Sequence, residues 1–327
     1  MRLATVLTPI SDKNAHLAAQ CGVTDVVDRY PGPTLDDVLR AKSRIEAYGL
    51  SLTVIEGYLP IEKIKMGRDD GQELEALKTL IVHMGKAGIP ILCYNFMAGT
   101  DWVRTKLDAQ ERGGALVTTF DLKEVEQAVL LGHDSGNSDF QRNEDDVTEE
   151  QLWDRLEKML VELVPVAEEA GVTLAMHPDD PPLLELLGKA RIMNSVENFE
   201  RLVELVPSSA NAICFCQGTF AAMGADILDV ISRLGRHIKY VHFRDVRGTT
   251  ESFVETFHDN GPTDMAAAIR ALQEVGFNGP IRPDHVPQLF GEENGEPGYT
   301  MLGRLFAYGF IRGLLQATNQ KSSNQTS

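Results

Sequence analysis

The sequence predicts a (β/α)8 barrel, the TIM-barrel fold, because two patterns repeat along its 327 residues. Short apolar runs alternate with longer amphipathic segments eight times in succession. Several amphipathic segments end at a glycine directly before the next apolar run, as helices do when a left-handed residue turns the chain back. An open, doubly wound sheet is the alternative, but neither a GxGxxG motif nor a phosphate-binding loop follows the first apolar run.

The eight apolar runs are expected to form the barrel strands, and the amphipathic segments between them the outer helices. In the fourth amphipathic segment, apolar side chains recur at three- and four-residue spacing from Leu152 to Val166, which is the period of a helix packed on one face. We expect strands at residues 3–8, 23–27, 51–55, 90–94, 173–176, 212–215, 238–242 and 280–284, and helices at 12–21, 34–48, 71–87, 148–170, 195–206, 226–234, 264–275 and 302–316.

A long segment after the fourth strand does not fit a minimal barrel. Residues 95–147 form an insertion with a candidate helix at 121–131 and the polar stretch GHDSGNSDFQRNEDD. Loops of this length are usually lids or disordered, and this one follows a strand end, so we expect a lid or a subunit contact. The sequence thus indicates a single barrel over residues 1–318 and a disordered polar tail over 319–327.

The composition limits the partners and the compartment. A net charge of −17 argues against nucleic acid or an anionic membrane as a partner. The four cysteines do not form a disulfide framework, and we see neither a signal peptide nor an apolar run of the roughly 20 residues that a membrane helix needs. We therefore expect a cytoplasmic protein that acts on a small molecule.

Four short motifs place a good metal ligand at the end of strands five to eight. They are MHPDDPP with His177, CFCQGT with Cys216, VHFRDV with His242 and RPDH with Asp284. The carboxyl ends of barrel strands converge on one face, and adjacent strands lie about 4.8 Å apart, so four neighbouring ends can reach one ion. Two imidazoles, a thiolate and a carboxylate suit Mn²⁺, Fe²⁺ or Zn²⁺ better than Ca²⁺.

Each ligand also has a structural interpretation. A lone histidine at a strand end is more often a hydrogen-bonded core residue, a buried cysteine is usually inert, and an aspartate after proline often caps a turn. Four such residues at four successive strand ends favour the metal site. Cys214 and Cys216 share one face of their strand; we favour Cys216 because it lies at the strand end, beside Gln217-Gly218-Thr219.

At these motifs the sequence resembles the D-mannonate dehydratase family of the xylose isomerase-like barrel superfamily. The matching pieces run almost from end to end, and the combination of HPDDPP with RPDH is not a general barrel pattern. They are residues 93–105, 166–182, the Cys216-x-Gly218 turn, His242-x-Arg244, FHDNGPTDM at 257–265, RPDH at 282–285 and PGYTMLGRL at 297–305.

The resemblance implies a (β/α)8 fold and a divalent ion, Mn²⁺ first and Fe²⁺ second. It implies loss of water from D-mannonate or a close aldonate to give a 2-keto-3-deoxy acid (2-dehydro-3-deoxy-D-gluconate), a step of hexuronate catabolism. The matching motif positions make His177, Cys216, His242 and Asp284 the metal ligands and Tyr299 a catalytic acid/base. Gln217 and Thr219, Asp245, and Val286-Pro287 depart from the family pattern, which bears on the substrate pocket.

Dehydration of an aldonate needs a base for the C2 proton and an acid for the C3 hydroxyl. Tyr299, His285 and Asp284 are the candidates, although Asp284 serves equally well as a ligand alone. Arg244 could hold the substrate carboxylate, or could pair with a protein acid instead. Further candidates for substrate contact are Asn95 and Arg104, beside Trp102 on the loop after strand four, and His258 after strand seven. Asp179 and Asp180 could orient His177, or could instead cap the next segment.

Two other functions fit the same barrel. A sugar isomerase or epimerase would use mostly Glu and Asp ligands, whereas only Asp284 of these four ligands is a carboxylate. A non-catalytic sugar-acid-binding protein would have no need of Tyr299. We therefore expect a metal-dependent hydro-lyase that acts on a small sugar acid and assembles as a homo-oligomer, a dimer or tetramer.

Overall fold

The computed structural model describes residues 1–130 and 146–319, and eight parallel strands close into a barrel. The barrel closes where β1 pairs with β16, with Arg2 opposite Pro280. All eight predicted strands are confirmed. In order around the barrel they are β1 (Arg2–Val6), β2 (Asp25–Asp28), β3 (Ser51–Glu56), β4 (Ile91–Tyr94), β9 (Thr173–Met176), β12 (Asn211–Cys216), β13 (Ile238–Phe243) and β16 (Pro280–Pro283).

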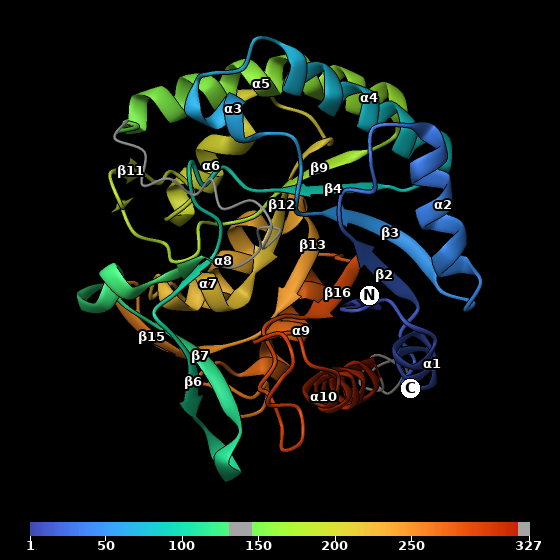
Figure 1. Cartoon of the computed structure of the whole chain (residues 1–327), viewed down its shortest axis with the longest axis vertical. Helices are drawn as coiled ribbons and strands as arrows, with labels where there is room; N and C mark the ends of the chain where they lie inside the picture. Colours follow the sequence, from blue (N-terminus) through green and yellow to red (C-terminus); the bar gives the residue numbers. More distant parts are fainter. Residues whose placement is uncertain (131–145, 320–327) are drawn as a thin grey trace, which may run out of the picture.

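The eight helices predicted outside the insertion are also confirmed, and they lie outside the strands (Figure 1). Two of them begin at capping boxes, Thr34 with Asp37 and Thr148 with Gln151. The long helices are α1 (Asp12–Gln20), α2 (Leu35–Glu46), α4 (Gln72–Ala87), α5 (Glu149–Ala170), α6 (Val196–Leu205), α8 (Ile227–Leu234), α9 (Met265–Glu274) and α10 (Met301–Asn319); α3 (Glu62–Met66) and α7 (Gln217–Ala222) are short.

Two apolar layers hold the barrel together. The larger layer lies between strands and helices and includes Ile55, Leu160 and Ile269, none of which is exposed. The smaller layer fills the barrel interior, where Val54, Cys93 and Cys214 are among the buried residues. A filled interior leaves the strand ends as the place for chemistry.

The insertion after β4 forms strands. Its elements β6 (Lys106–Gln110) and β7 (Leu116–Asp121) join β14 (Val246–Thr249) and β15 (Ser252–Glu255) in one antiparallel sheet. Phe120 lies opposite Phe253 in this sheet, and the β6–β7 hairpin projects from the body of the molecule (Figure 1). The insertion is thus joined to the loop after β13, on the side where the strands end.

The helix predicted at 121–131 is wrong in length and type, because only a short 3₁₀ helix forms within this range. Asp121 ends β7 and its side chain accepts a hydrogen bond from the backbone of Lys123, which starts a short 3₁₀ helix, η2 (Leu122–Gln127). A second short pair, β5 (Val103–Arg104) with β8 (Val129–Leu130), follows. Strand pairing therefore bounds the helical turn on both sides, with Asp121 paired to β15 and Val129–Leu130 paired to β5.

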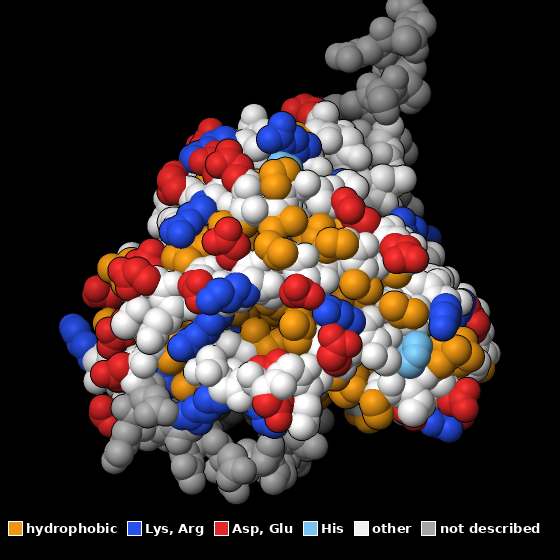
Figure 2. All heavy atoms as spheres, turned by 90° about the horizontal axis from the view of Figure 1, so that it is seen from above, with side chains coloured by type: hydrophobic (Ala, Val, Ile, Leu, Met, Phe, Trp, Pro, Cys, Tyr) orange, Lys and Arg blue, Asp and Glu red, His pale blue; other side chains and the backbone are white. Residues whose placement is uncertain are grey.

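Two predictions concern the polar stretch of the insertion and the C-terminal tail. GHDSGNSDFQRNEDD starts at residue 132 and lies almost wholly outside the described residues, as does the tail from residue 320. Asn319, which we expected in the tail, belongs to α10. Within the described ranges no helix combines the length and apolar character needed to cross a membrane. On the face in Figure 2, acidic and basic side chains are interspersed, with apolar atoms between them.

Candidate metal centre and active site

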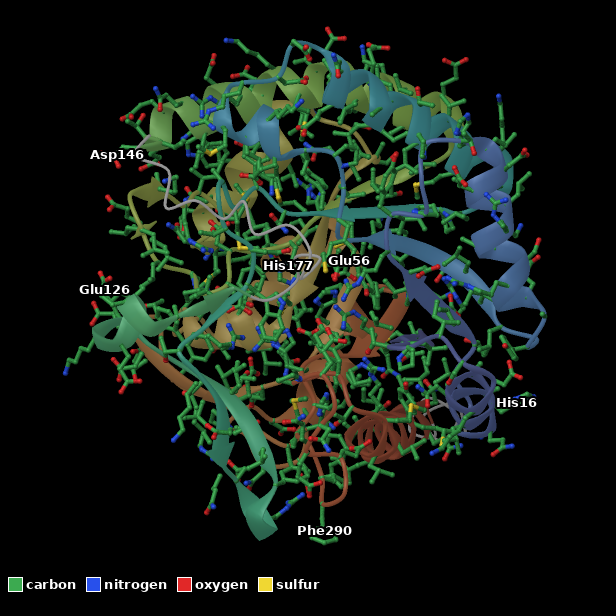
Figure 3. All side chains as sticks on the ribbon, viewed as in Figure 1. His16, Glu56, Glu126, Asp146, His177 and Phe290 are labelled. Carbon is green, nitrogen blue, oxygen red and sulfur yellow. The ribbon has the colours of Figure 1, made fainter. Side chains whose placement is uncertain are left out.

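The four predicted ligands come from four neighbouring strand ends. His177 follows β9, Cys216 ends β12, His242 lies near the end of β13, and Asp284 follows β16. Strand register fixes the arrangement, because Cys216 lies directly opposite His242. Figure 3 shows His177 near the middle of the barrel, beside Glu56 from the end of β3.

The ligand atoms of these residues lie close together. One atom each from His177, Cys216 and His242 lies within 4.8 Å of the other two, and His177 Nε2 is 3.1 Å from His242 Nδ1. Asp284 Oδ2 is 3.7 Å from His242 Nδ1 and 4.0 Å from Cys216 Sγ. Two imidazoles, a thiol and a carboxylate at these distances fit a borderline divalent ion.

The charges of the site match a cation. Burial raises the pKa of the Cys216 thiol, but Arg244 and His177 outweigh burial and hold that pKa well below its ordinary value. The pKa of Asp284 is likewise held well below its ordinary value, because His285, Arg282 and other cationic neighbours outweigh burial. The thiolate and the carboxylate are therefore the stable forms, as a metal requires.

The two imidazoles present one nitrogen each toward the centre. His177 Nδ1 lies 2.7 Å from the carbonyl oxygen of Pro178, which can only accept, so a neutral His177 carries its proton there and leaves Nε2 free. Burial lowers the pKa of His177, but the Cys216 thiolate outweighs burial and raises it to about 10. On the far side of His242, Nε2 lies 3.3 Å from Glu56 Oε1.

Cys214 lies one pleat deeper than Cys216 and differs from it chemically. Burial raises the pKa of Cys214 well above its ordinary value, and its contact with Cys93 raises it further. Cys214, Cys93 and His242 also place ligand atoms within 4.8 Å of one another. Since a metal binds the thiolate, the difference in pKa favours Cys216.

A network of four buried charges borders the ligands. Arg104 Nη1 and Nη2 donate to the two oxygens of Asp180 at 2.8 and 2.9 Å, and Arg244 Nη2 reaches Asp180 Oδ2 at 2.9 Å. Both arginines also bind Glu255, on β15. The two positive and two negative charges compensate one another, as burial of charge demands. The network joins the insertion to the barrel at the edge of the metal centre.

Arg244 and Arg104 use their hydrogen-bond donors within the protein. Arg244 donates from Nε to Asp284 Oδ2, from Nη1 to both oxygens of Glu255, and from Nη2 to Asp180 and Thr219. All five N–H groups of Arg244 are therefore engaged. Of the two roles that the sequence left open for Arg244, the structure shows the ion pair with protein carboxylates. Arg104 is fully buried and similarly engaged. Neither side chain has free donors for a substrate carboxylate.

Tyr299 and His285 lie together under Trp102. The Trp102 ring stacks on His285 with centroids 4.0 Å apart, and Tyr299 meets both rings edge-on. His285 Nδ1 lies 2.9 Å from Glu255 Oε1, while its Nε2 is 3.7 Å from Asp284 Oδ1. Burial, followed by Asp284, raises the pKa of Tyr299 to about 12. Tyr299 is therefore protonated at neutral pH and can act as an acid.

The other residues that the sequence suggested for the site are Asn95, His258 and Asp179, and each has a different environment. Asn95 is engaged by Lys65 and Asp101. His258 is buried, and burial lowers its pKa to about 4. Asp179 accepts from the backbone of Met193.

The prediction that Asp179 or Asp180 orients His177 is wrong for the described residues. His177 is held by the Pro178 carbonyl, and the Asp180 carboxylate is taken up by Arg104 and Arg244.

Three residues of the site were missed in the sequence. Glu56 ends β3 and Arg29 follows β2, so the strand-end rule that found the metal ligands would have found both. The Arg29 guanidinium carbon lies over the Tyr299 ring, 5.8 Å from its centroid, and the buried Arg29 Nε has no partner among the described residues. Glu255 carries no comparable signal, because its role depends on Arg104 and Arg244 from distant parts of the chain.

Comparison with known proteins shows the family of the chain. The model of the D-mannonate dehydratase (UxuA) family matches residues 15–325. The chain is 34% identical over 300 residues to mannonate dehydratase of Oceanobacillus iheyensis, covering 86% of this chain and 85% of that protein. It is 35% identical over 311 residues to mannonate dehydratase of Streptococcus pneumoniae, covering 89% and 84%.

Solved structures give the same result. The crystal structure of mannonate dehydratase from Streptococcus suis serotype 2 superposes with a TM-score of 0.88 at 30% identity, over 98% of this chain and 96% of that one. A structure of L-ribulose 3-epimerase superposes with a TM-score of 0.64 at 17% identity, over 100% and 98%. The second likeness concerns the fold alone.

Proposed function

The chain belongs to the D-mannonate dehydratase family and is a hydro-lyase that dehydrates a sugar acid; from this premise we propose its substrate and its ion. The substrate is D-mannonate or a close aldonate, and the product is the 2-keto-3-deoxy acid, 2-dehydro-3-deoxy-D-gluconate, plus water. The ion is Mn²⁺, with Fe²⁺ as second choice, held by His177, Cys216, His242 and Asp284. The observation that carries the proposal is the convergence of these four side chains at the strand ends.

A bound divalent ion would supply Lewis-acid polarisation of the substrate carboxylate, which stabilises negative charge that develops at C2. The protein residues provide the proton transfers. We assign the C2 proton to His285 Nε2, since Nδ1 faces the Glu255 carboxylate, which holds the ring in place. Asp284 serves as a ligand, because its low pKa makes it a weak base.

Tyr299 is the proposed acid. With a pKa of about 12 its phenol carries a proton at neutral pH, and it can protonate the C3 hydroxyl as the C3–O bond breaks. Water leaves, and the C2–H electron pair forms the C2=C3 double bond of an enol. The enol then becomes the 2-ketone as its C2 hydroxyl loses a proton to solvent and C3 gains a proton from solvent, and the proton taken by His285 returns through solvent to the Tyr299 phenolate.

Arg29 is the proposed partner of the substrate carboxylate, in place of Arg244. It follows β2 at the same end of the barrel and has a buried Nε without a partner in the described chain. Its contact with the Tyr299 ring places it beside the proposed acid. A guanidinium whose Nε is unused suits a carboxylate.

A substrate screen tests the proposal. The purified protein, loaded with Mn²⁺ or with Fe²⁺, is incubated with a panel of aldonates that includes D-mannonate, and 2-keto-3-deoxy acids are measured. We expect product from D-mannonate or a close epimer. Interconversion of free aldoses and ketoses, without product from any aldonate, would instead support an isomerase or epimerase.

A further inference from the structure

Arg304 lies buried beside the proposed acid. It belongs to the segment PGYTMLGRL and stands in the first turn of α10, shortly after Tyr299 in the chain. Its side chain is 3% exposed, and its guanidinium carbon lies over the Tyr299 ring, 5.4 Å from the ring centroid. The reaction steps assigned above leave this positive charge without a role.

The Arg304 guanidinium has no anionic partner. Its Nη2 donates to Thr8 Oγ1 at 2.9 Å, while the buried Nη1 has no hydrogen-bond partner among the described residues. In the part of the chain that the structure describes, no carboxylate forms an ion pair with Arg304. Burial lowers the pKa of Arg304, and the phenols of Tyr308 and Tyr299 raise it less. Because a buried charge without a counter-charge is costly, this cation destabilises the resting fold.

Thr8 holds Arg304 against Tyr299. The Thr8 hydroxyl, which accepts from Arg304 Nη2, itself donates to the backbone carbonyl oxygen of Tyr299 at 3.3 Å. Arg304 is thus connected to Tyr299 twice, through this hydroxyl and through the contact with the ring. These contacts keep the positive charge at the phenol.

Two other cations near Tyr299 differ from Arg304 because they have anionic partners. Arg282 Nη1 donates to Asp284 Oδ1 at 2.8 Å. Arg29 lies over the Tyr299 ring as well, but it is the proposed partner of the substrate carboxylate. With substrate bound, Arg304 is therefore the one of these three guanidinium groups that still lacks a counter-charge.

We propose that Arg304 is a positioning residue for the dehydration, whose charge balances the negative charge that Tyr299 acquires as it gives up its proton. This inference rests on the proposed function. As the C3–O bond breaks, the Tyr299 O–H bond breaks too, its proton leaves with the C3 hydroxyl as water, and a phenolate remains. The phenolate is the anion that Arg304 lacks in the resting site. A charge that is in place before the reaction lowers the barrier without reorganisation.

Removal of this charge tests the proposal on the aldonate that the protein dehydrates. R304Q and R304M remove the charge, R304K keeps it, and R312Q is the matched control, because Arg312 lies on the same helix and is exposed. We expect R304Q and R304M to lower kcat about 10- to 100-fold with KM changed less than about twofold. R304K should recover most of this loss, and R312Q should leave kcat unchanged. The melting temperature of R304M should not fall, because the variant removes a buried, unpaired charge.

A double-mutant cycle with Y299F separates this role from a purely structural one. Since Arg304 acts through the Tyr299 hydroxyl, R304Q should lower kcat no further when it is combined with Y299F. A side chain that only supports the fold would lower kcat equally in both backgrounds.

Two results would overturn the inference while the proposed function stands. One is product formation by R304Q and R304M at the kcat of the wild type. The other is a loss of kcat on R304Q that is as large in the Y299F protein as in the wild type. Absence of product from every aldonate would overturn the proposed function, and this inference with it.

Discussion

Replacement of Glu255 by glutamine tests whether the buried charge network supports the active site. The side chain is 2% exposed and accepts hydrogen bonds from Arg104, from Arg244 at 2.9 and 3.0 Å, and from His285 at 2.9 Å. Glu255→Gln keeps the size of the side chain but removes its charge. It also turns one acceptor into an amide donor that faces a guanidinium.

The expected loss of stability follows from these contacts. Removal of one partner from a buried ion pair costs about 3–5 kcal/mol, because the other charge stays buried and unpaired. For a chain of this length the entropy of unfolding is about 0.7 kcal/mol/K, so we expect the melting temperature to fall by about 4–7 °C. Activity should fall about 10- to 100-fold, because His285 loses the carboxylate that orients it.

Thermal unfolding and steady-state kinetics measure both effects, with Glu75→Gln as the control. Glu75 is 69% exposed and pairs with Lys78 at the surface, so the same substitution should cost less than about 1 kcal/mol there. A melting temperature for Glu255→Gln within about 1 °C of the wild type, or unchanged activity, would refute the role given to the network.

Three further changes test other parts of the site. Tyr299→Phe should lower kcat by about 10²- to 10⁴-fold with an unchanged melting temperature, because only the acid is lost; a kcat near that of the wild type would exclude Tyr299 as the acid. Arg29→Gln should raise KM for the aldonate about tenfold or more, and an unchanged KM would count against the carboxylate contact. Between pH 6.5 and about 4, His258 binds a proton in the unfolded chain but not in the folded chain. The free energy of unfolding measured in urea should therefore fall by about 3 kcal/mol as the pH falls through this range. His258→Gln should remove that part of the pH dependence, and an identical pH dependence in both proteins would contradict the prediction.

The barrel could be predicted from the sequence because its signals are local. Each strand is a short apolar run, and each ligand is a polar residue directly after such a run, so the order of strands alone brings His177 and Asp284 to the same end. The same rule, applied to the first half of the chain, would also have found Arg29 and Glu56. We predicted Cys216 and not Cys214 as the ligand because Cys216 lies at the end of the strand and Cys214 lies one pleat deeper. The pKa of Cys216 is lowered and that of Cys214 is raised, which agrees with this prediction.

The insertion and the charge network could not be predicted in this way. Residues 122–127 form only a short 3₁₀ helix, because the strands on either side of them pair with residues that are distant in the sequence. Arg104 meets Glu255 across 151 positions. Arg244 looked free for a substrate because the acids that occupy it lie on other elements.

The metal content of two cysteine variants tests the central claim most directly. Cys216→Ser and Cys214→Ser are each loaded with Mn²⁺, and bound metal is measured by elemental analysis beside the wild type. We predict that Cys216→Ser binds metal at least about tenfold more weakly and loses activity, while Cys214→Ser retains both. Full metal content in Cys216→Ser, with loss in Cys214→Ser, would contradict the assignment and move the ligand one pleat into the barrel.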